Sequence, residues 1–345
     1  MTDDLASVGE RAALARIIPR LRTRRRSPDG VILGPGDDAA ILAAPDGRVL
    51  LSTDAMVEGP DFRRAWSSFW NIGYKAIATN LADIAAMGGR PTGLLVALAA
   101  PGDTLVTDLE ELAGGMADAC GRLTRGRGLP VVEVVGGDLT RSPVLSVSVT
   151  VVGSLDGREA VLRSGARPGD AIGYCGLLGH ASAALRLLFA TGEDDAAAIE
   201  DLFTRKHALL MTQVAPTPPT SAGIVAAEAG ATAMLDVSDG LLLDAMRIAE
   251  ASGVILDLDR SVLDGYVDDL LDASQGKRVA VPPPRREEAL ALVLGGGEDH
   301  GLLACFPGEP PQGFRRLGTV RQGAPAVMID SERADPTGWD SFAPS

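Results

Sequence analysis

Short apolar runs separated by glycine-rich breaks alternate with longer segments of helical spacing through the first half of the chain. The runs at 49–52, 93–99, 131–135 and 144–152 predict strands, and the last one alternates apolar and small polar residues. The segments 66–87 and 107–122 repeat apolar residues at the spacing of a helix. The pattern therefore predicts a β-rich α/β domain over residues 1–155.

A second set of elements follows the glycine and proline cluster at 163–170. Apolar runs at 171–175, 233–237, 254–258 and 302–306 predict strands, and helical spacing begins at Gly179 and again at 239–252. The segment 265–284 is acidic and then proline-rich, which predicts a variable surface excursion. A second α/β domain is expected over residues 156–345.

Aspartate recurs beside small residues along both halves of the chain. The instances are Gly36-Asp37-Asp38, Ser52-Thr53-Asp54, Asn80 to Asp83, Gly136-Gly137-Asp138, Asp236 to Asp239 and Gly297-Glu298-Asp299. Carboxylates beside glycine at strand ends can converge in a crevice, because glycine lets a ligand approach the backbone. Ionised carboxylates that converge repel one another, and Mg²⁺ with oxygen ligands relieves the repulsion. Since substrate phosphates usually complete a Mg²⁺ site, the cluster predicts metal-assisted phosphoryl transfer from ATP or another polyphosphate.

Each aspartate also has a structural alternative, as a turn residue, a helix cap or an exposed strand end. Their number favours the functional interpretation. Asp83 is the most specific, because it shares one face of an otherwise apolar helix with Ala76 and Asn80, where a lone carboxylate needs a partner. The sequence has no Gly-x-x-x-x-Gly-Lys-Ser/Thr loop, kinase glycine loop or Gly-x-Ser-x-Gly elbow, so familiar nucleotide loops and covalent catalysis are disfavoured.

Charge and cysteine content narrow the function further. The 345 residues carry 46 acidic and 32 basic side chains, a net charge of −14. This balance disfavours nucleic acid as a partner, and it implies that an anionic ligand is bound through cations. The three cysteines have no metal-ligand spacing, the N-terminus is acidic, and no apolar run is long enough to span a membrane. A cytoplasmic protein without a membrane partner is expected.

The motifs, taken in order, resemble the thiamine-monophosphate kinase family, in the superfamily that includes aminoimidazole ribonucleotide synthetase. The matching segments are Gly34-Pro-Gly-Asp-Asp-Ala-Ala40, Ser52-Thr-Asp54, the run from Lys75 to Gly88, Gly136-Gly-Asp138, the run from Leu162 to Asp170, Asp236-Val-Ser-Asp-Gly-Leu241, Gly296-Gly-Glu-Asp-His300 and Gly338-Trp-Asp-Ser-Phe342. The resemblance covers nearly the whole chain, and the match at 296–300 is typical of the actinobacterial branch.

The resemblance implies a two-domain α/β (α+β) fold. N-terminal sheets would join across a homodimer into a barrel, and a C-terminal α/β domain would cover each cleft. The implied reaction is ATP-dependent phosphorylation of thiamine monophosphate to thiamine diphosphate, by direct in-line transfer with several Mg²⁺ ions.

Residue roles are also carried over from the resemblance. The implied metal ligands are Asp38, Ser52, Thr53, Asp54, Asp83, Asp138, Asp236 and Asp239, of which Asp54, Asp83, Asp138 and Asp239 are expected to be catalytic. The implied ATP contacts are Gly137, Asp138, Arg163 and Ser238. The implied substrate contacts are Asp61, Glu298 and Trp339.

Two positions depart from the family pattern. Asp61 stands where family members usually carry a substrate-contacting histidine, which should weaken phosphate binding unless Arg63 or Arg64 compensates. Ala113 stands where an aromatic residue is common, which puts adenine stacking there in doubt. Asp61 also favours the alternative of a non-catalytic protein that binds nucleotide or thiamine phosphate. Selenophosphate synthetase and the hydrogenase-maturation member are disfavoured because their N-terminal or C-terminal cysteine is missing, which leaves another ATP-using member of the superfamily as a further alternative.

Overall fold

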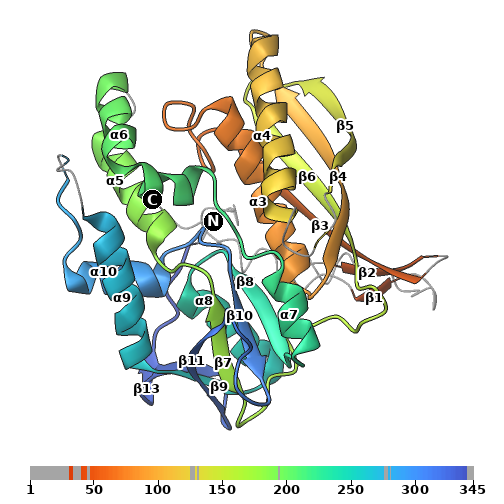
Figure 1. Cartoon of the computed structure of the whole chain (residues 1–345), viewed down its shortest axis with the longest axis vertical. Helices are drawn as coiled ribbons and strands as arrows, with labels where there is room; N and C mark the ends of the chain where they lie inside the picture. The colour runs from red at the N-terminus through yellow and green to blue at the C-terminus, as the bar shows by residue number, and fades with distance from the viewer. Residues whose placement is uncertain are drawn as a thin grey trace, which may run out of the picture.

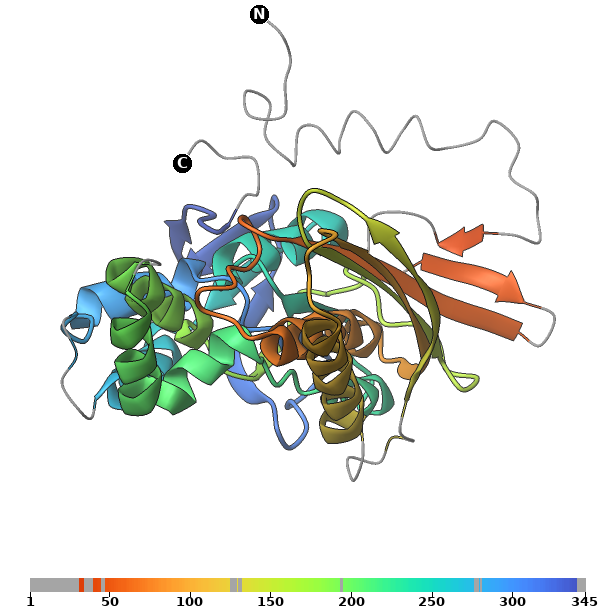
Figure 2. The ribbon, with the colours of Figure 1, turned by 90° about the horizontal axis from the view of Figure 1, so that it is seen from above.

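A computed structural model describes residues 31–33, 40–44, 47–124, 129, 132–192, 195–275, 279 and 281–339. These residues form two sheets, and one helix lies between them and packs on both (Figures 1 and 2). The first sheet has the strand order β1-β2-β3-β6-β4-β5. Its strands are β1 (Val31–Leu33), β2 (Ala40–Ala44), β3 (Gly47–Val57), β4 (Arg90–Ala100), β5 (Val134–Arg141) and β6 (Ser146–Ser154). All pairings are antiparallel except that of β4 with β5.

Two helices cover one face of the first sheet, α3 (Phe69–Ala86) and α4 (Val106–Thr124). They pack unusually closely because Gly73 and Gly115 lie in the contact. A Cβ atom on Gly73 would lie 2.0 Å from the Leu112 carbonyl oxygen, and one on Gly115 would lie 2.0 Å from the Trp70 carbonyl oxygen. Helix α3 begins with a capping box between Ser68 and Asn71.

The second sheet has the order β13-β12-β9-β11-β7-β10-β8. Its strands are β7 (Ala171–Cys175), β8 (Ala233–Val237), β9 (Ile255–Leu258), β10 (Gly301–Phe306), β11 (Arg315–Arg321), β12 (Ala326–Ile329) and β13 (Glu332–Ala334). The helices of this half are α5 (His180–Thr191), α6 (Ala196–Val214), α7 (Ala222–Glu228), α8 (Leu241–Ser252), α9 (Arg260–Ser274) and α10 (Arg286–Gly295). The strands predicted at 171–175 and 233–237 are confirmed.

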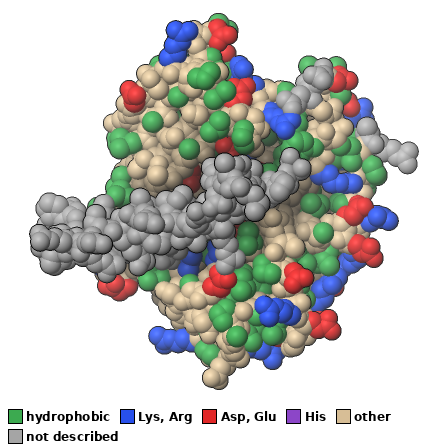
Figure 3. Space-filling view, turned by 180° about the vertical axis from the view of Figure 1, so that it is seen from behind, with side chains coloured by type: hydrophobic (Ala, Val, Ile, Leu, Met, Phe, Trp, Pro, Cys, Tyr) green, Lys and Arg blue, Asp and Glu red, His purple; other side chains and the backbone are tan. Residues whose placement is uncertain are grey.

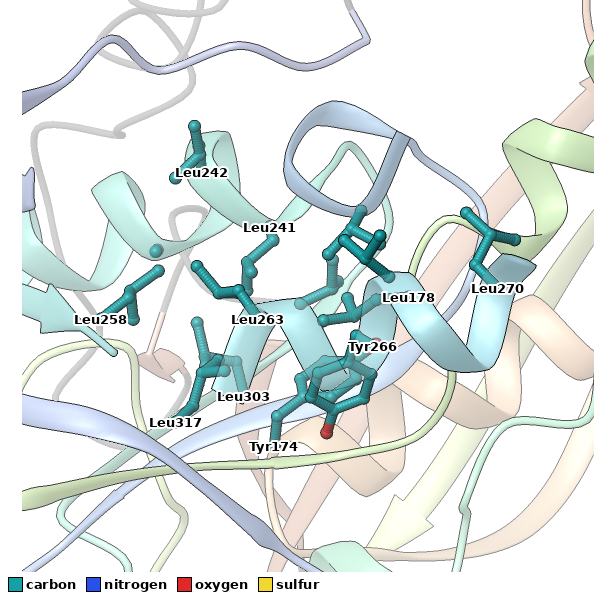
Figure 4. Packing of buried hydrophobic residues seen from close by; sticks show 14 of the residues in the cluster. Tyr174, Leu178, Leu241, Leu242, Leu258, Leu263, Tyr266, Leu270, Leu303 and Leu317 are labelled. Atoms are coloured by element: carbon teal, nitrogen blue, oxygen red, sulfur yellow. The ribbon is translucent and has the colours of Figure 1, made fainter. Parts of the chain in front are cut away.

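The main core of this half lies between the sheet and the group α5, α6, α8, α9 and α10. Tyr174 on β7 meets Tyr266 on α9 edge to face, with ring centroids 5.8 Å apart, and leucines from β9, β10 and β11 belong to the same cluster (Figure 4). Helix α7 and the last turn of α3 cover the opposite face, where Ala85 and Ala86 join Met234 and Phe306.

Helix α3 is the joint between the two halves. It packs on β3, β4 and β6 on one side and on β8 and β10 on the other, and its apolar residues are buried nearly all round. A helix that is apolar all round belongs in an interior. Three polar side chains of α3, those of Lys75, Thr79 and Asp83, line the cavity described below.

Two predictions about local structure are wrong. The segment 265–274 is the greater part of α9, and its Tyr266, Val267 and Leu270 are buried at helical spacing. Its acidic composition comes from the outer face, where Asp268 and Asp269 pair with Arg286 and Arg315. The run at 131–135 predicts a strand that ends before Asp138. The observed strand β5 begins at Val134 and runs to Arg141, so Asp138 lies within it.

On the face seen in Figure 3, acidic and basic side chains of the described residues are interspersed. None of the described helices is long and apolar enough to cross a membrane. All three cysteines are free thiols, and Cys120 and Cys305 are buried.

Candidate active site

A cavity of about 400 Å³ opens between the two sheets. Its walls come from β3, the loop at 58–67, helices α3, α5 and α6, the turn after β8, the loop before β10, and Trp339. One end is lined by carboxylates and the other by apolar side chains. The cavity therefore presents carboxylate oxygens together with apolar and aromatic surface.

The acidic end contains Asp54 on β3, Asp83 on α3, Asp236 at the end of β8 and Asp239 in the turn before α8. Ser52 donates a hydrogen bond of 2.5 Å from its hydroxyl to Asp83 Oδ2. Burial and the negative charges of Asp236 and Asp239 raise the pKa of Asp54, although His300 and Asp83 oppose the shift. Four carboxylates from three separate segments thus share one end of the cavity.

Two basic residues moderate this negative charge. His300 lies with its Nδ1 atom 3.2 Å from Asp236 Oδ2, and both side chains are buried. Arg247 donates to Asp239 Oδ2 at 2.6 Å and also binds Asp244. Asp239 is not the cap of α8, because that position is taken by Gly240. Asp239 lines the cavity while its Oδ2 atom is held by Arg247.

Glu298 lines the cavity from the loop before β10, and its backbone N–H donates to the Ser238 carbonyl at 2.7 Å. The Lys75 Nζ atom donates to its Oε1 at 2.6 Å, and the Gln213 Nε2 atom donates to its Oε2 at 2.5 Å. Burial alone would raise the pKa of Glu298, but the Lys75 ammonium and these hydrogen bonds hold it below its ordinary value. The loop approaches Ser238 so closely that a Cβ atom on Gly297 would lie 2.7 Å from the Ser238 carbonyl oxygen.

Asp61 also lines the cavity, but its carboxylate accepts a hydrogen bond of 2.7 Å from the Val57 backbone N–H. Burial raises the pKa of Asp61, while that hydrogen bond and Lys75 act in the opposite direction. Of the two arginines that follow, Arg63 lines the cavity and Arg64 does not. Arg64 pairs with Glu58 at 2.5 Å.

The apolar end is built around an aromatic contact between the two halves. Trp66 from the first half meets Phe189 on α5 edge to face, at 5.0 Å between centroids. The Trp66 indole N–H donates to the Gly192 carbonyl at 2.9 Å. The Arg63 guanidinium lies over both rings, 4.8 Å and 4.9 Å from their centroids. Trp339, with 58% of its surface exposed, also lines the cavity, but beside the acidic end, where its backbone N–H donates to the Asp239 carbonyl at 2.8 Å.

Some predicted residues lie away from the cavity. The Thr53 hydroxyl donates to the Val149 carbonyl at 3.0 Å. Gly137 and Asp138 lie on the exposed edge strand β5, and Arg163 lies beside Ser252 at the end of α8, where Ser252 donates to its carbonyl oxygen. Asp38 lies outside the described residues. The structure thus brings together Asp54, Asp83, Asp236, Ser238, Asp239, Asp61, Glu298 and Trp339, with Ser52 bonded to Asp83.

Several cavity residues received no role from sequence reasoning, chiefly Lys75, Gln213 and His300. A signal for Lys75 was present, because positions 75, 79 and 83 follow the i, i+4, i+8 spacing of one helix face and Asp83 was found by the same argument. Nothing in the sequence pairs Gln213 with Glu298, because 85 positions separate them.

Within the described residues, no three histidine, cysteine or acidic side chains form a ready-made metal cage. The donor set still fits Mg²⁺, since it consists of four carboxylates from three segments and Mg²⁺ keeps several water or phosphate ligands. Sulfur and nitrogen ligands, which softer metals prefer, are absent from this carboxylate group apart from the neighbouring His300.

Comparisons with known proteins find relatives of this chain in sequence and in fold. Residues 36–155 match the family model of the AIR synthase related protein, N-terminal domain. The thiamine-monophosphate kinase of Mycobacterium tuberculosis is 43% identical over 327 residues, covering 94% of this chain and 90% of that protein. Two solved structures share the fold: AaThiL complexed with AMPPCP and TMP (28% identity, 99% of each chain, TM-score 0.76), and thiamine monophosphate kinase from Aquifex aeolicus (27% identity, 96% and 100% of the chains, TM-score 0.72).

Proposed function

The chain belongs to the thiamine-monophosphate kinase family, and we propose that it catalyses the ATP-dependent phosphorylation of thiamine monophosphate to thiamine diphosphate. The observation that carries this proposal is the 43% identity to the Mycobacterium tuberculosis enzyme over 94% of the chain. A cavity that joins a carboxylate group to an aromatic and apolar wall supports it. The likeness to a structure holding an ATP analogue and TMP is further support.

Magnesium is the cation proposed for the acidic end. Asp54, Asp83, Asp236 and Asp239 would hold it, with Ser52 supporting Asp83. Asp38 and Thr53 stay in the proposed ligand set from the family resemblance. The ions supply charge neutralisation for the polyphosphate during transfer. The acidic cavity would otherwise repel a phosphate.

The proposed reaction needs no proton transfer by a residue of the chain. A phosphate monoester has its second pKa near 6, so the acceptor oxygen of thiamine monophosphate is already ionised at neutral pH. No general base is needed to activate it. The work of the residues is to bind, orient and exclude water, so that donor and acceptor lie in line. A direct transfer without a phosphoenzyme agrees with the absence of a nucleophile motif in the sequence.

The thiamine moiety is proposed to bind toward Glu298 and Trp339. The Glu298 carboxylate is ionised and fixed by two donors, and an aromatic face such as that of Trp339 attracts a cationic thiazolium ring. Asp61 is kept as a proposed substrate contact on the same wall. Ser238 lines the cavity between these residues and the carboxylates, which suits its proposed role in ATP binding.

A homodimer is proposed because it would complete the ATP site. Asp138 and Ala55 lie at the same height along their strands, on a line that crosses the sheet. Ala55 pairs with Ser148, Ser148 pairs with Ala97, and Ala97 pairs with Asp138. Three strand spacings of about 4.8 Å, or roughly 14 Å, separate it from β3 in the same chain. The outer edge of β5, and that of β3 beyond Leu51, have no partner among the described strands. Pairing these edges across a two-fold axis would bring the partner subunit's Asp138 beside Asp54.

The side chains on this sheet are consistent with such an interface. Leu95, Val135 and Leu139 expose 45%, 70% and 61% of their surfaces on β4 and β5. Large apolar side chains in a group are usually covered by a partner.

In this proposal the first domain, 1–155, provides ATP and Mg²⁺ ligands and the dimer contact. The second, 156–345, covers the cleft, while Gly137 and Arg163 are kept as ATP contacts. Residence in the cytoplasm is proposed with it, as the family and the free thiols suggest.

One observation favours a second candidate, a non-catalytic protein that binds nucleotide or thiamine phosphate. Asp61 adds a carboxylate to a cavity wall where an incoming phosphate would need a cation. Turnover separates the two functions. Purified protein would be incubated with ATP, Mg²⁺ and thiamine monophosphate, and thiamine diphosphate would be measured directly, with free thiamine as the control acceptor. Binding of thiamine monophosphate without any diphosphate product would favour the second candidate.

A further inference from the structure

Asp239, Asp244 and Arg247 form a closed ring of hydrogen bonds at the start of α8. The backbone N–H of Asp239 donates to Asp244 Oδ2 at 2.9 Å. Arg247 donates from one guanidinium nitrogen to Asp244 Oδ1, and from the other to Asp239 Oδ2 at 2.6 Å. Of the three residues, only Asp239 lines the cavity. Asp244 and Arg247 therefore stand behind a cavity residue and can act on the cavity only through it.

The path of the chain explains how the ring closes. Asp244 and Arg247 are three positions apart, so they share one face of α8. Gly240 has a φ of 118°, which favours glycine, and it turns the chain so that the Asp239 N–H meets the carboxylate on that face. The Asp239 carbonyl accepts the Trp339 N–H at 2.8 Å. The backbone of Asp239 is thus held on both sides.

Asp244 and Arg247 act on Asp239 through geometry more than through charge. Asp244 is 0% exposed and its carboxylate faces the Arg247 guanidinium, so the two charges largely offset each other. A guanidinium is a rigid planar fork, and here its two arms bind two different carboxylates. The direction of the Asp239 carboxylate is therefore set by a fork that is itself fixed by a buried partner.

One oxygen of the Asp239 carboxylate is left for a ligand. Arg247 holds Oδ2, and within the described part of the chain no hydrogen bond reaches Oδ1. A carboxylate that rotates freely loses conformational entropy when it binds a cation, whereas one that is already held has less to lose. In metal sites, the residues that orient the ligands from behind typically change the metal affinity by about ten- to a hundredfold.

We propose that Asp244 and Arg247 are positioning residues, which fix the Asp239 carboxylate, leave its Oδ1 atom for the cation and so raise the affinity of the chain for Mg²⁺ with nucleotide. This rests on the proposed function for the identity of the cation. A role in charge neutralisation alone predicts the opposite sign, because a cation close to Asp239 opposes the binding of a second cation there.

The test is calorimetric titration of the full chain with the Mg²⁺ complex of a non-hydrolysable ATP analogue, which needs no turnover. The double variant Asp244→Asn/Arg247→Met leaves no charge buried, and its Asn oxygen can still accept the Asp239 N–H. Only the hold on the Asp239 carboxylate is lost, so the Kd of the complex should rise about tenfold. A melt without ligand checks that the variant is folded. Should it not fold, Arg247→Met alone takes its place, with Asp244 left to bind a proton.

A cycle of variants distinguishes positioning from a general structural role. In an Asp239→Ala chain there is no carboxylate to position, so the same two substitutions should change the Kd by less than about twofold. Arg260→Met is the matched control, because Arg260 pairs with Asp264 on α9 and its side chain is 43% exposed, against 34% for Arg247. It should leave the Kd unchanged.

Several outcomes would overturn the proposal. They are unchanged or tighter binding by the folded double variant, an equal loss with and without the Asp239 carboxylate, and a wild-type chain whose binding of the analogue does not depend on Mg²⁺. A wild-type chain that behaves as expected throughout the cycle but forms no thiamine diphosphate would contradict the kinase function and leave the positioning role standing.

Discussion

The hydroxyl of Ser52 on β3 donates a 2.5 Å hydrogen bond to the carboxylate of Asp83 on α3. This contact joins the first sheet to the helix that lies between the two halves. It also holds Asp83 toward the strand that carries Asp54, so that the acidic end of the cavity is organised by the chain itself.

Asp54 is the first residue to test at the acidic end. Asp54→Asn should lower kcat by at least about a hundredfold, because it removes charge from the proposed Mg²⁺ site. Burial and neighbouring carboxylates raise the pKa of Asp54, so its ionised form is disfavoured in the folded chain without cations. The metal-free variant should therefore melt at the same temperature as wild type or slightly higher. Steady-state kinetics and thermal melts with and without Mg²⁺ and an ATP analogue check both points.

The exposed Asp103, outside the cavity, supplies the control Asp103→Asn, which should match wild type in both assays. Near-normal turnover by Asp54→Asn, together with unchanged stabilisation by Mg²⁺ and nucleotide, would remove Asp54 from the proposed ligand set.

Asp138 tests the proposed dimer through mixed subunits. Asp138→Asn and Asp54→Asn should each be inactive alone. If Asp138 serves the partner's site, a mixed dimer regains one intact site, so random mixing should restore about a quarter of wild-type activity. If both residues serve a site in one chain, every site in the mixture carries a lesion and activity stays at background. Subunit exchange followed by an assay of thiamine diphosphate formation distinguishes these outcomes.

The arginines after Asp61 differ in position and give a matched pair. Arg63 lines the cavity, whereas Arg64 pairs with Glu58 outside it. Arg63→Met should raise the KM for thiamine monophosphate about tenfold, because a cation near an acidic cavity assists a phosphate. Arg64→Met should leave that KM unchanged. Equal effects of the two substitutions would show that only the overall charge matters.

Asp61 itself can be exchanged for a potential cation. Asp61→His should lower the KM for thiamine monophosphate several-fold and leave the KM for ATP unchanged. It also removes the acceptor for the Val57 N–H, at a cost of about 1 kcal/mol in stability. Asp61→Asn keeps an acceptor and removes the charge, so it separates the two effects. An unchanged KM in Asp61→His would mean that another group already fills the role.

Asp299 predicts a pH dependence of stability. Its carboxylate accepts the backbone N–H groups of Gly179 and Ala181 at the start of α5, and burial raises its pKa to about 7 from 3.8. Between these values the folded chain binds the proton more tightly than the unfolded chain. The free energy of unfolding should therefore fall as pH rises through this window, by at most about 1.4 kcal/mol per pH unit.

Denaturant unfolding of wild type and Asp299→Asn between pH 5 and 8 measures this effect. The variant should lose part of the slope and retain the part due to Asp244, whose pKa burial also raises to about 7. Parallel curves for the two proteins would show that Asp299 does not titrate in this range.

Local sequence patterns predict many of the helices and strands, and they single out most of the aspartates that line the cavity. The strands at 171–175 and 233–237 follow from short apolar runs, and Asp83 follows from one polar position on an apolar helix face. The α9 helix was missed because its acidic outer face dominates the composition, while burial of Tyr266 and Leu270 against other segments decides its structure. The Gly136-Gly-Asp138 pattern predicts a strand end, because glycine and aspartate usually mark turns, but β5 continues to Arg141.

The sequence by itself determined the family, the charge and the chemical type of the site, because these depend on residue identity and on spacing within single elements. Only the tertiary structure decided which of those residues meet. Lys75, Gln213 and Glu298 are brought together by the packing of α3 and α6 around the cavity, whereas Asp138 and Arg163 lie away from it. Contacts across more than a hundred positions depend on how whole elements pack, and no local pattern encodes that packing.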